Sequence, residues 1–380
     1  MLDVLIAGAG PAGSIAALVL ARAGARVLLV DRETFPRPKL CGDTLNPGAI
    51  RLLASLKLRG GPLATAKPLR GMIVTGLHGR RVEARYPGNQ VGLALTRTEL
   101  DAWLLDAAIA AGARFEPGLI ARRPLIDESS GRPLVRGLSL DRRGSAGESI
   151  RMPATMTIAA DGRHSTVARS LGLAATPDRP RRWAFGVYAT GVEGITDLGE
   201  MHVRANYYYG VAPLAGGLSN ICVVTGPRPS GRSPVEIVHR AIDADTHLRH
   251  RFARARFETG VTVLGPLAVN ARAAGVEGLL LAGDAAGFVD PMTGDGLSLA
   301  MRGAQLAALE ASRTLENGDF AGAVKRLDES RRQAFRSKLR FNRMVRRLVD
   351  SPIAIEIAGW GAAVAPGLVE RAVRYAGDAA

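Results

Sequence analysis

The sequence has few cysteines and few aromatic residues for its 380 positions, and each shortage narrows the class of protein. Cys41 and Cys222 are its two cysteines, so disulfides cannot form the framework of the fold, and a reducing compartment is expected. No Cys-x-x-Cys pair and no cluster of histidines indicates a metal site. Hydrophobic residues make up 47% and aromatic residues 5% of the chain, which is typical of a soluble core built from aliphatic side chains.

Long apolar runs are missing as well. No stretch reaches the about 18–20 apolar residues that a membrane-spanning helix needs. The opening residues 1–3 lead directly into an apolar run without the basic segment of a secretory signal, so we expect a cytoplasmic protein. No Ser-His-Asp pattern or pair of carboxylates suggests hydrolysis.

Acidic residues are outnumbered, 35 against 50 Lys and Arg, which gives a net charge of +15. Such a charge can attract nucleic acid, anionic lipid or phosphorylated molecules such as NADPH. We expect no nucleic acid partner, because no binding motif or basic stripe with interleaved aromatics is present. The region after residue 311 is basic and of helical character. It is a candidate for peripheral contact with an anionic membrane, and the alternative is a solvated helical cover.

Glycine is abundant, with 45 residues, and it forms a first signature near the start of the chain. Gly8-x-Gly10-x-x-Gly13 follows the apolar run 4–7 and precedes a helical pattern over 14–23. A second apolar run over 26–30 ends in Asp31. This strand–helix–strand arrangement, with an acid about 20 residues after the glycines, predicts a dinucleotide-binding unit.

Each residue of this signature has an expected role. Gly8 permits the tight turn, Gly10 lets the backbone approach a pyrophosphate, and Gly13 allows close packing of helix on strand. The helix N-terminus attracts the phosphates, and Asp31 accepts from a ribose hydroxyl. The alternative is a turn in which the glycines serve packing alone.

A second signature indicates which dinucleotide is bound. The apolar run 279–282 delivers Gly283-Asp284 at the carboxyl end of a predicted strand, where ligands bind in open α/β sheets. An Asp there can hold a ribityl hydroxyl, a group that FAD has and nicotinamide cofactors lack. Pro291 stiffens the following loop, and the segment 294–296 opens a predicted helix over 297–312. The alternative is a strand–loop–helix with a solvated Asp.

A third element lies between the two signatures. The predicted strand 157–160 runs into Asp161, and the turn that follows leads to a helix. Upstream, a helix is predicted to start at Thr98, which places Arg97 where it can reach a phosphate or the edge of a flavin.

Together these motifs resemble the glutathione-reductase-like FAD superfamily over residues 1 to about 310, and within it the geranylgeranyl reductase branch. That branch is itself similar to three other groups of flavoproteins: the electron-transfer-flavoprotein–quinone reductases, the aromatic hydroxylases and the flavin-dependent halogenases. Gly287 favours the reductase branch, since hydroxylases usually have His at this point. The segment 39–42, Lys-Leu-Cys-Gly, resembles a family turn beside the flavin. The halogenase tryptophan motif and a matching lysine are absent.

The chain departs from the branch at the segment that walls its lipid pocket. The family pattern Tyr-x-Trp-x-Phe-Pro is matched here by residues 208–213, with Gly210 in place of the Trp and Ala212 in place of the Phe. We therefore expect a wider pocket and a substrate other than the usual one.

The resemblance implies a set of cofactor contacts and three candidate catalytic residues. The hydroxyl of Tyr208 can donate a proton or shape the cavity, and the alternative is a ring packed for its area. Cys41 is a candidate acid or redox partner, and the alternative is a small buried hydrophobe. The catalytic candidates are Cys41, Tyr208 and Pro291. The expected cofactor contacts are Gly8, Gly10, Pro11, Ala12, Gly13, Asp31, Arg32, Cys41, Gly42, Arg97, Asp161, Gly283, Asp284, Pro291, Gly294, Gly296 and Leu297.

The expected fold is α/β, with a Rossmann-like FAD-binding domain, an interleaved mixed β-sheet substrate domain and C-terminal helices. The cofactor domain is predicted over 1–70, 95–170 and 265–310, the substrate domain over 71–94 and 171–264, and the helical region over 311–380. We expect an FAD-dependent oxidoreductase that reduces carbon–carbon double bonds in a hydrophobic small molecule, with NAD(P)H a candidate electron donor. An NAD(P)H- and oxygen-dependent monooxygenase and a non-enzymatic lipid escort are the alternatives.

Overall fold

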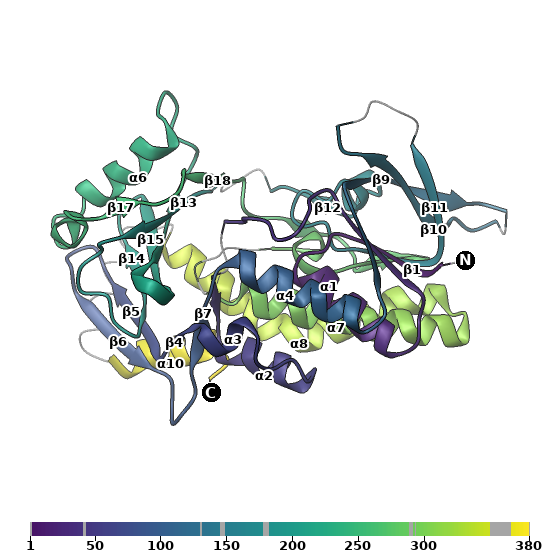
Figure 1. The fold of residues 1–380 in the computed structure, drawn as a ribbon, viewed down its shortest axis with the longest axis horizontal. Helices are drawn as coiled ribbons and strands as arrows, with labels where there is room; N and C mark the ends of the chain where they lie inside the picture. Colours follow the sequence, from purple (N-terminus) through teal and green to yellow (C-terminus); the bar gives the residue numbers. More distant parts are fainter. Residues whose placement is uncertain are drawn as a thin grey trace.

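The fold consists of two large sheets and a set of helices beneath them (Figure 1). The computed structural model describes residues 2–40, 43–129, 131–144, 149–177, 182–288, 292, 294–349 and 366–379. Within these residues each large sheet has eight strands. The mixed α/β architecture with two sheets confirms the predicted fold class.

The first sheet is built on parallel strands in the order β21-β11-β1-β2-β8, with β20 antiparallel at one edge. Strands β9 and β10 extend antiparallel from β11 and fold over one face. Strand β1 lies at the centre, as a buried apolar strand of a parallel sheet should. The bounds are β1 (Leu2–Ala7), β2 (Val27–Asp31), β8 (Arg114–Pro117), β9 (Leu119–Asp127), β10 (Leu134–Arg142), β11 (Ile150–Ala159), β20 (Gly275–Val276) and β21 (Leu279–Leu281).

Helices cover the other face of the first sheet and form one core with it. Helix α4 begins at Arg97, one residue earlier than predicted, because Thr96 and Glu99 form a capping box. Helix α7 continues to Asn317 and ends at Gly318, whose φ is +71°. The helices of this part are α1 (Pro11–Arg22), α2 (Pro47–Ser55), α3 (Pro62–Thr65), α4 (Arg97–Ala110), α5 (Thr166–Ser170, on the opposite face), α7 (Gly296–Asn317) and α8 (Phe320–Val349).

The second sheet has the strand order β17-β13-β16-β15-β14-β5-β6, and β18 also pairs with β13. Helix α6 covers its outer face, where Phe185, Tyr209 and Val223 are buried (Figure 1). Its inner face points back to the segments that surround the cofactor signatures. The bounds are β5 (Gly71–Thr75), β6 (Arg81–Arg85), β13 (Trp183–Thr190), β14 (Gly199–Val203), β15 (Tyr207–Pro213), β16 (Ser219–Thr225), β17 (Arg256–Phe257), β18 (Thr262–Leu264) and α6 (Pro234–Asp243).

Smaller elements complete the described chain, and α10 packs against β6. None of the helices in the described part combines the length and apolar character that crossing a bilayer requires. The domain boundaries given above stay a prediction. The remaining elements are β3 (Thr44–Leu45), β4 (Lys67–Leu69), β7 (Gly92–Ala94), β12 (Ala174–Ala175), β19 (Asn270–Ala271), α10 (Pro366–Ala376) and the 3-10 helices η1 (Ala215–Gly217), η2 (Arg249–Phe252) and η3 (Gly283–Ala286).

Candidate cofactor and substrate site

The three glycines of the first signature lie at the turn from β1 into α1, and they differ in what surrounds them. Gly8 has a φ of +98°, and a Cβ there would lie 2.4 Å from the Ala160 carbonyl oxygen. A Cβ on Gly13 would lie 1.7 Å from the Gly8 carbonyl oxygen, so helix and turn pack too closely for any side chain. A Cβ on Gly10 would meet only an Arg37 nitrogen at 3.5 Å. Packing within the protein therefore does not require glycine at position 10, and its predicted role beside a pyrophosphate stays a prediction.

The start of α1 is suited to bind phosphate. Gly10 is its N-cap and has no side chain to accept from the first N–H groups, and Pro11 and Ala12 open the helix. An uncapped helix N-terminus presents N–H groups and a partial positive charge, which is a common site for a pyrophosphate.

Two carboxylates flank this helix start. Asp31 at the end of β2 accepts from the backbone N–H groups of Ala9 (2.7 Å) and Glu33 (2.9 Å). Asp161 follows β11 beside Gly8, and its Oδ2 accepts from the Thr166 N–H at 3.2 Å. Its Oδ1 is buried and has no hydrogen-bond partner within the described residues. Burial raises the pKa of Asp161 to about 6, and the nearby Asp31 adds to the rise.

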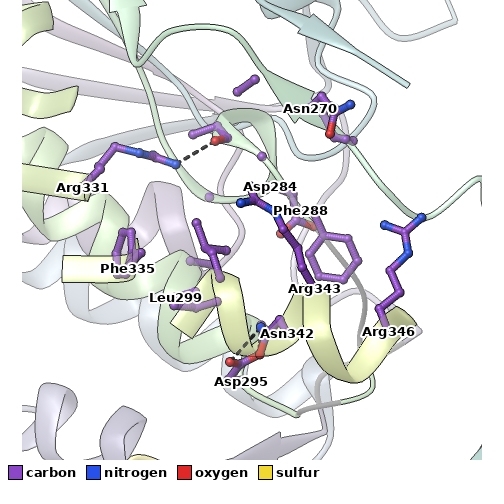
Figure 2. Close-up of a pocket in the computed structure, with 18 residues that line it drawn as sticks. Asn270, Asp284, Phe288, Asp295, Leu299, Arg331, Phe335, Asn342, Arg343 and Arg346 are labelled. Atoms are coloured by element: carbon purple, nitrogen blue, oxygen red, sulfur yellow. Dashed lines mark hydrogen bonds between the residues drawn. The ribbon is translucent and has the colours of Figure 1, made fainter. Parts of the chain in front are cut away.

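The second signature reaches the same region from β21. Gly283 has a φ of +59°, and a Cβ there would lie 2.7 Å from the Ala12 side chain, so η3 packs against the start of α1. Asp284 lines a cavity together with Gly296, the first residue of α7 (Figure 2). The two signatures, far apart in sequence, are therefore neighbours in space.

Basic side chains lie between these motifs and the second sheet. Arg97 donates two N–H groups to the buried Asp101, at 2.7 and 2.8 Å, and Arg37 pairs with the same carboxylate at 3.2 Å. Burial lowers the pKa of Lys39 to about 8, with the charge of Arg97 acting the same way and that of Asp284 against it. Arg97 is thus held by its own helix, and its contact with the cofactor stays a prediction.

The inner face of the second sheet carries the residues that the family resemblance emphasised. Side chains alternate along β15, so Tyr208 faces inward and Tyr209 faces α6, where its hydroxyl donates to Asp245 at 2.6 Å. Tyr208 is 3% exposed, and the Arg182 guanidinium lies 5.6 Å from the centre of its ring. The structure places Tyr208 on the side of the cofactor segments, and a catalytic role for it stays a prediction.

A row of small residues crosses this face, with one residue from each of the strands β13, β16 and β15. Cys222 of β16 pairs with Gly186 of β13 on one side and with Gly210 of β15 on the other. Leu40 fills the space over Gly186, where a Cβ would lie 1.8 Å from the Leu40 Cδ1. A Cβ on Gly210 would meet nothing closer than 3.6 Å, so the position tolerates a side chain directed at the inner face.

A buried polar cluster that sequence reasoning missed lies at the edge of the same face. Asp43 is 3% exposed and accepts from the Arg97 backbone N–H at 3.1 Å and from the Asn220 amide. Burial raises the pKa of Asp43 to about 6, although these bonds favour its charged form. Burial also raises the pKa of Tyr188, and the charge of Asp43 adds to this rise. The only sequence signal was the position of Asp43 directly after the Lys-Leu-Cys-Gly turn.

The positions of the other predicted site residues say less about their roles. Arg32 forms a largely exposed ion pair with Glu33 at 3.5 Å. Leu297 is buried in the first turn of α7, and Gly294 precedes that helix with a φ of +65°. Cys41, Gly42 and Pro291 lie outside the described residues. No group of histidines, cysteines and acids that could hold a metal ion occurs in the described part of the chain.

The residues present fit FAD. The uncapped start of α1 suits a diphosphate, and the orphaned Oδ1 of Asp161 requires a donor that the described chain does not supply. Asp284 lies in η3, directly after β21, and its contact with the polar chain between the diphosphate and the ring stays a prediction.

Comparison with known proteins agrees with this site. The family model described as FAD binding domain matches residues 1–310. The chain is 33% identical over 328 residues to a menaquinone reductase of Mycobacterium tuberculosis, covering 80% of this chain and 75% of the relative. It is 29% identical over 346 residues to digeranylgeranylglycerophospholipid reductase 2 of Methanopyrus kandleri, covering 88% and 83%.

Solved structures share the fold. A geranylgeranyl bacteriochlorophyll reductase-like protein from Thermoplasma acidophilum has a TM-score of 0.80 at 22% identity, over 93% of this chain and 89% of the other. A flavin-dependent brominase has a TM-score of 0.85 at 19% identity, over 99% and 93%. At these identities the likeness extends to the fold alone.

Proposed function

This chain belongs to the FAD-binding-domain family and is an FAD-dependent oxidoreductase, and we propose that it reduces carbon–carbon double bonds of an isoprenoid lipid or a similar hydrophobic molecule. The observation that carries the proposal is the apolar inner face of the second sheet. There Tyr208 and Val224 cluster with Leu40 and Phe288, which come from the segments that surround the cofactor signatures. A hydrophobic substrate bound on this face lies next to the segments that surround the two cofactor signatures.

The named relatives support the reaction class. Both are called reductases, one of menaquinone and one of digeranylgeranylglycerophospholipid. Gly210 and Ala212 leave the inner face less filled than the branch pattern, which fits a substrate of different shape.

Reduction of a double bond adds one hydride and one proton, and bound FAD, once reduced, supplies the hydride. The residues of this chain position the alkene and deliver the proton. The apolar face excludes water from the reacting carbons. The hydroxyl of Tyr188, which lies beside the buried Asp43, is the group we propose as the proton donor, and water restores its proton after each turnover.

Two further proposals, for the electron donor of FAD and for the location of the protein in the cell, are based on the positive charge of the chain. We propose NAD(P)H as the reductant of FAD, since the net charge of +15 attracts a phosphorylated dinucleotide. The basic α8 supports the proposal that the protein contacts anionic membranes, where isoprenoid lipids reside.

Anaerobic reoxidation tests the proposal. The purified FAD-loaded protein is reduced with dithionite, and its absorbance near the flavin maximum is followed after addition of menaquinone or geranylgeraniol, with the saturated alcohol as control. We expect reoxidation by at least one unsaturated lipid, with a product that gains two hydrogens in its isoprenoid chain. In a parallel incubation under ¹⁸O₂ with a reductant, a product that carries one labelled oxygen identifies a monooxygenase instead.

A further inference from the structure

A cavity of about 410 Å³ lies between α8 and the segment 283–288, and its wall is unusually rich in arginine. Arg331, Arg343 and Arg346 come from α8, and Asp284 and Asp295 are the carboxylates among the lining residues, so the wall carries one net positive charge. Figure 2 shows Arg331 and Arg343 extending from α8 toward the segment that carries Asp284. The volume is in the range of small-molecule sites.

Arg331 is held in this wall without a close counter-charge. One of its N–H groups donates to the Ala286 carbonyl oxygen at 2.7 Å. Burial lowers its pKa, and among the described residues the carboxylate that offsets this effect is Asp328. Asp328 is itself paired with Arg332 at 3.7 Å on the solvent side of α8. Arg331 is half-buried. A guanidinium that is partly removed from water is stabilised by an anion beside it, because desolvating an unpaired charge is costly.

Asn342 supplies a second, independent indication of a ligand. It is 3% exposed, and its amide nitrogen donates to both oxygens of Asp295, at 3.2 and 3.1 Å. Since a carboxylate accepts only, the amide oxygen must point away from Asp295. That oxygen has no hydrogen-bond partner within the described chain. The cavity therefore combines one guanidinium without a close counter-charge, that of Arg331, with one buried acceptor without a donor, the amide oxygen of Asn342.

The anion in question is distinct from the FAD diphosphate. The cavity shares Gly283 and Asp284 with the cofactor site, but none of its described lining residues comes from β1, α1 or β2, where the diphosphate is expected. Phe288 lines the cavity and also belongs to the apolar cluster of the inner sheet face. Phe288 is thus shared by the wall of the cavity and the apolar cluster of the substrate side.

We propose that this cavity binds a phosphate ester that carries a neighbouring hydroxyl group. Phosphate oxygens can bridge guanidinium groups on different turns of one helix, and arginine recognises them by paired hydrogen bonds. The hydroxyl donates to the orphaned oxygen of Asn342. A phospholipid head group and a soluble sugar or glycerol phosphate share this chemistry.

Calorimetric titration of the FAD-loaded full chain at low salt tests the site with four probes. These are glycerol 1-phosphate, methyl phosphate without the hydroxyl, dihexanoyl phosphatidylglycerol, and dihexanoylglycerol without the phosphate. We expect both phosphates with a hydroxyl to bind, methyl phosphate to bind about fivefold more weakly, and dihexanoylglycerol to bind at least about tenfold more weakly than its phospholipid. Tighter binding of the phospholipid than of glycerol 1-phosphate identifies a lipid as the source, and equal binding identifies a soluble phosphate.

Variants of residues on α8 test whether the phosphate probes bind in this cavity. Arg343→Gln, at an exposed position, should weaken glycerol 1-phosphate about tenfold, and Arg331→Gln should do the same where it folds. Arg340→Gln, exposed on the same helix outside the cavity, is the matched control and should change binding less than about twofold. The proposal is overturned if Arg340→Gln weakens binding as much as Arg343→Gln, if the uncharged lipid binds as tightly as the charged one, or if glycerol 1-phosphate releases FAD.

Discussion

The buried carboxylate of Asp43 makes the stability of this protein depend on pH, and the substitution Asp43→Asn removes this contribution. Its pKa is raised from 3.8 to about 6, chiefly by burial. Below pH 4 the group is protonated in the folded and unfolded chain alike. Between pH 4 and 6 the unfolded chain loses the proton while the folded chain keeps it, so rising pH favours unfolding.

The size of the effect follows from the shift. One pKa unit corresponds to about 1.4 kcal/mol, so the full shift is worth about 3 kcal/mol, of which the wild-type protein should lose about 2 kcal/mol between pH 4.5 and 7.5. Asp43→Asn removes the titration. Its altered hydrogen bond to Asn220 shifts stability by a constant amount at every pH. The stability of the variant relative to wild type should therefore rise by about 2 kcal/mol over this range.

Urea unfolding of both FAD-saturated proteins at pH 4.5, 5.5, 6.5 and 7.5, followed by tryptophan fluorescence, measures the difference. Asp161, with a raised pKa, and His164, with a lowered one, also titrate in this range, but they are common to both chains and cancel. Asp106→Asn, an exposed change on α4, is the control and should track wild type. A difference between Asp43→Asn and wild type that is flat with pH, or that falls as pH rises, refutes the reasoning.

Three further predictions follow from the site. Asp284→Ala should weaken FAD binding about 10- to 100-fold by fluorescence titration, whereas Asp243→Ala, an exposed change at the end of α6, should not; equal loss in both would contradict the assignment. Gly210→Trp with Ala212→Phe should refill the inner face and abolish lipid-dependent reoxidation while FAD stays bound, and unchanged turnover would show that the substrate lies elsewhere. Flotation with anionic liposomes should exceed that with neutral ones and weaken steeply with salt, at about 1 kcal/mol per basic residue near the surface; equal recovery would argue against membrane contact.

The elements around the cofactor could be predicted because each motif is local. A run such as 4–7, a following glycine turn and an acid at the next strand end specify a strand–helix–strand unit by chain connectivity alone. The roles of Gly8 in the tight turn and of Gly13 in close packing were predicted for the same reason, and the structure gives both residues contacts that no Cβ allows. Alternation along β15 likewise required that Tyr208 and Tyr209 face opposite sides, although sequence could not say which side faced the cofactor.

The parts of the site that the sequence did not predict depend on contacts between segments that are far apart in the chain. Asp43, Asn220 and Tyr188 meet only because β13 and β16 pair in one register beside the loop that follows Leu40, and a shift by one residue would turn both side chains to the outer face. Arg97 shows the converse, since its neighbour Asp101 one turn later holds the guanidinium that a motif-based argument directs to the cofactor. A motif therefore predicts where a backbone goes, whereas the partner of a charged side chain depends on which neighbour reaches it first. In this protein, the proposed phosphate site rests on a guanidinium without a close counter-charge and on an amide oxygen without a donor in the described chain, and such shortages become visible only once the fold is known.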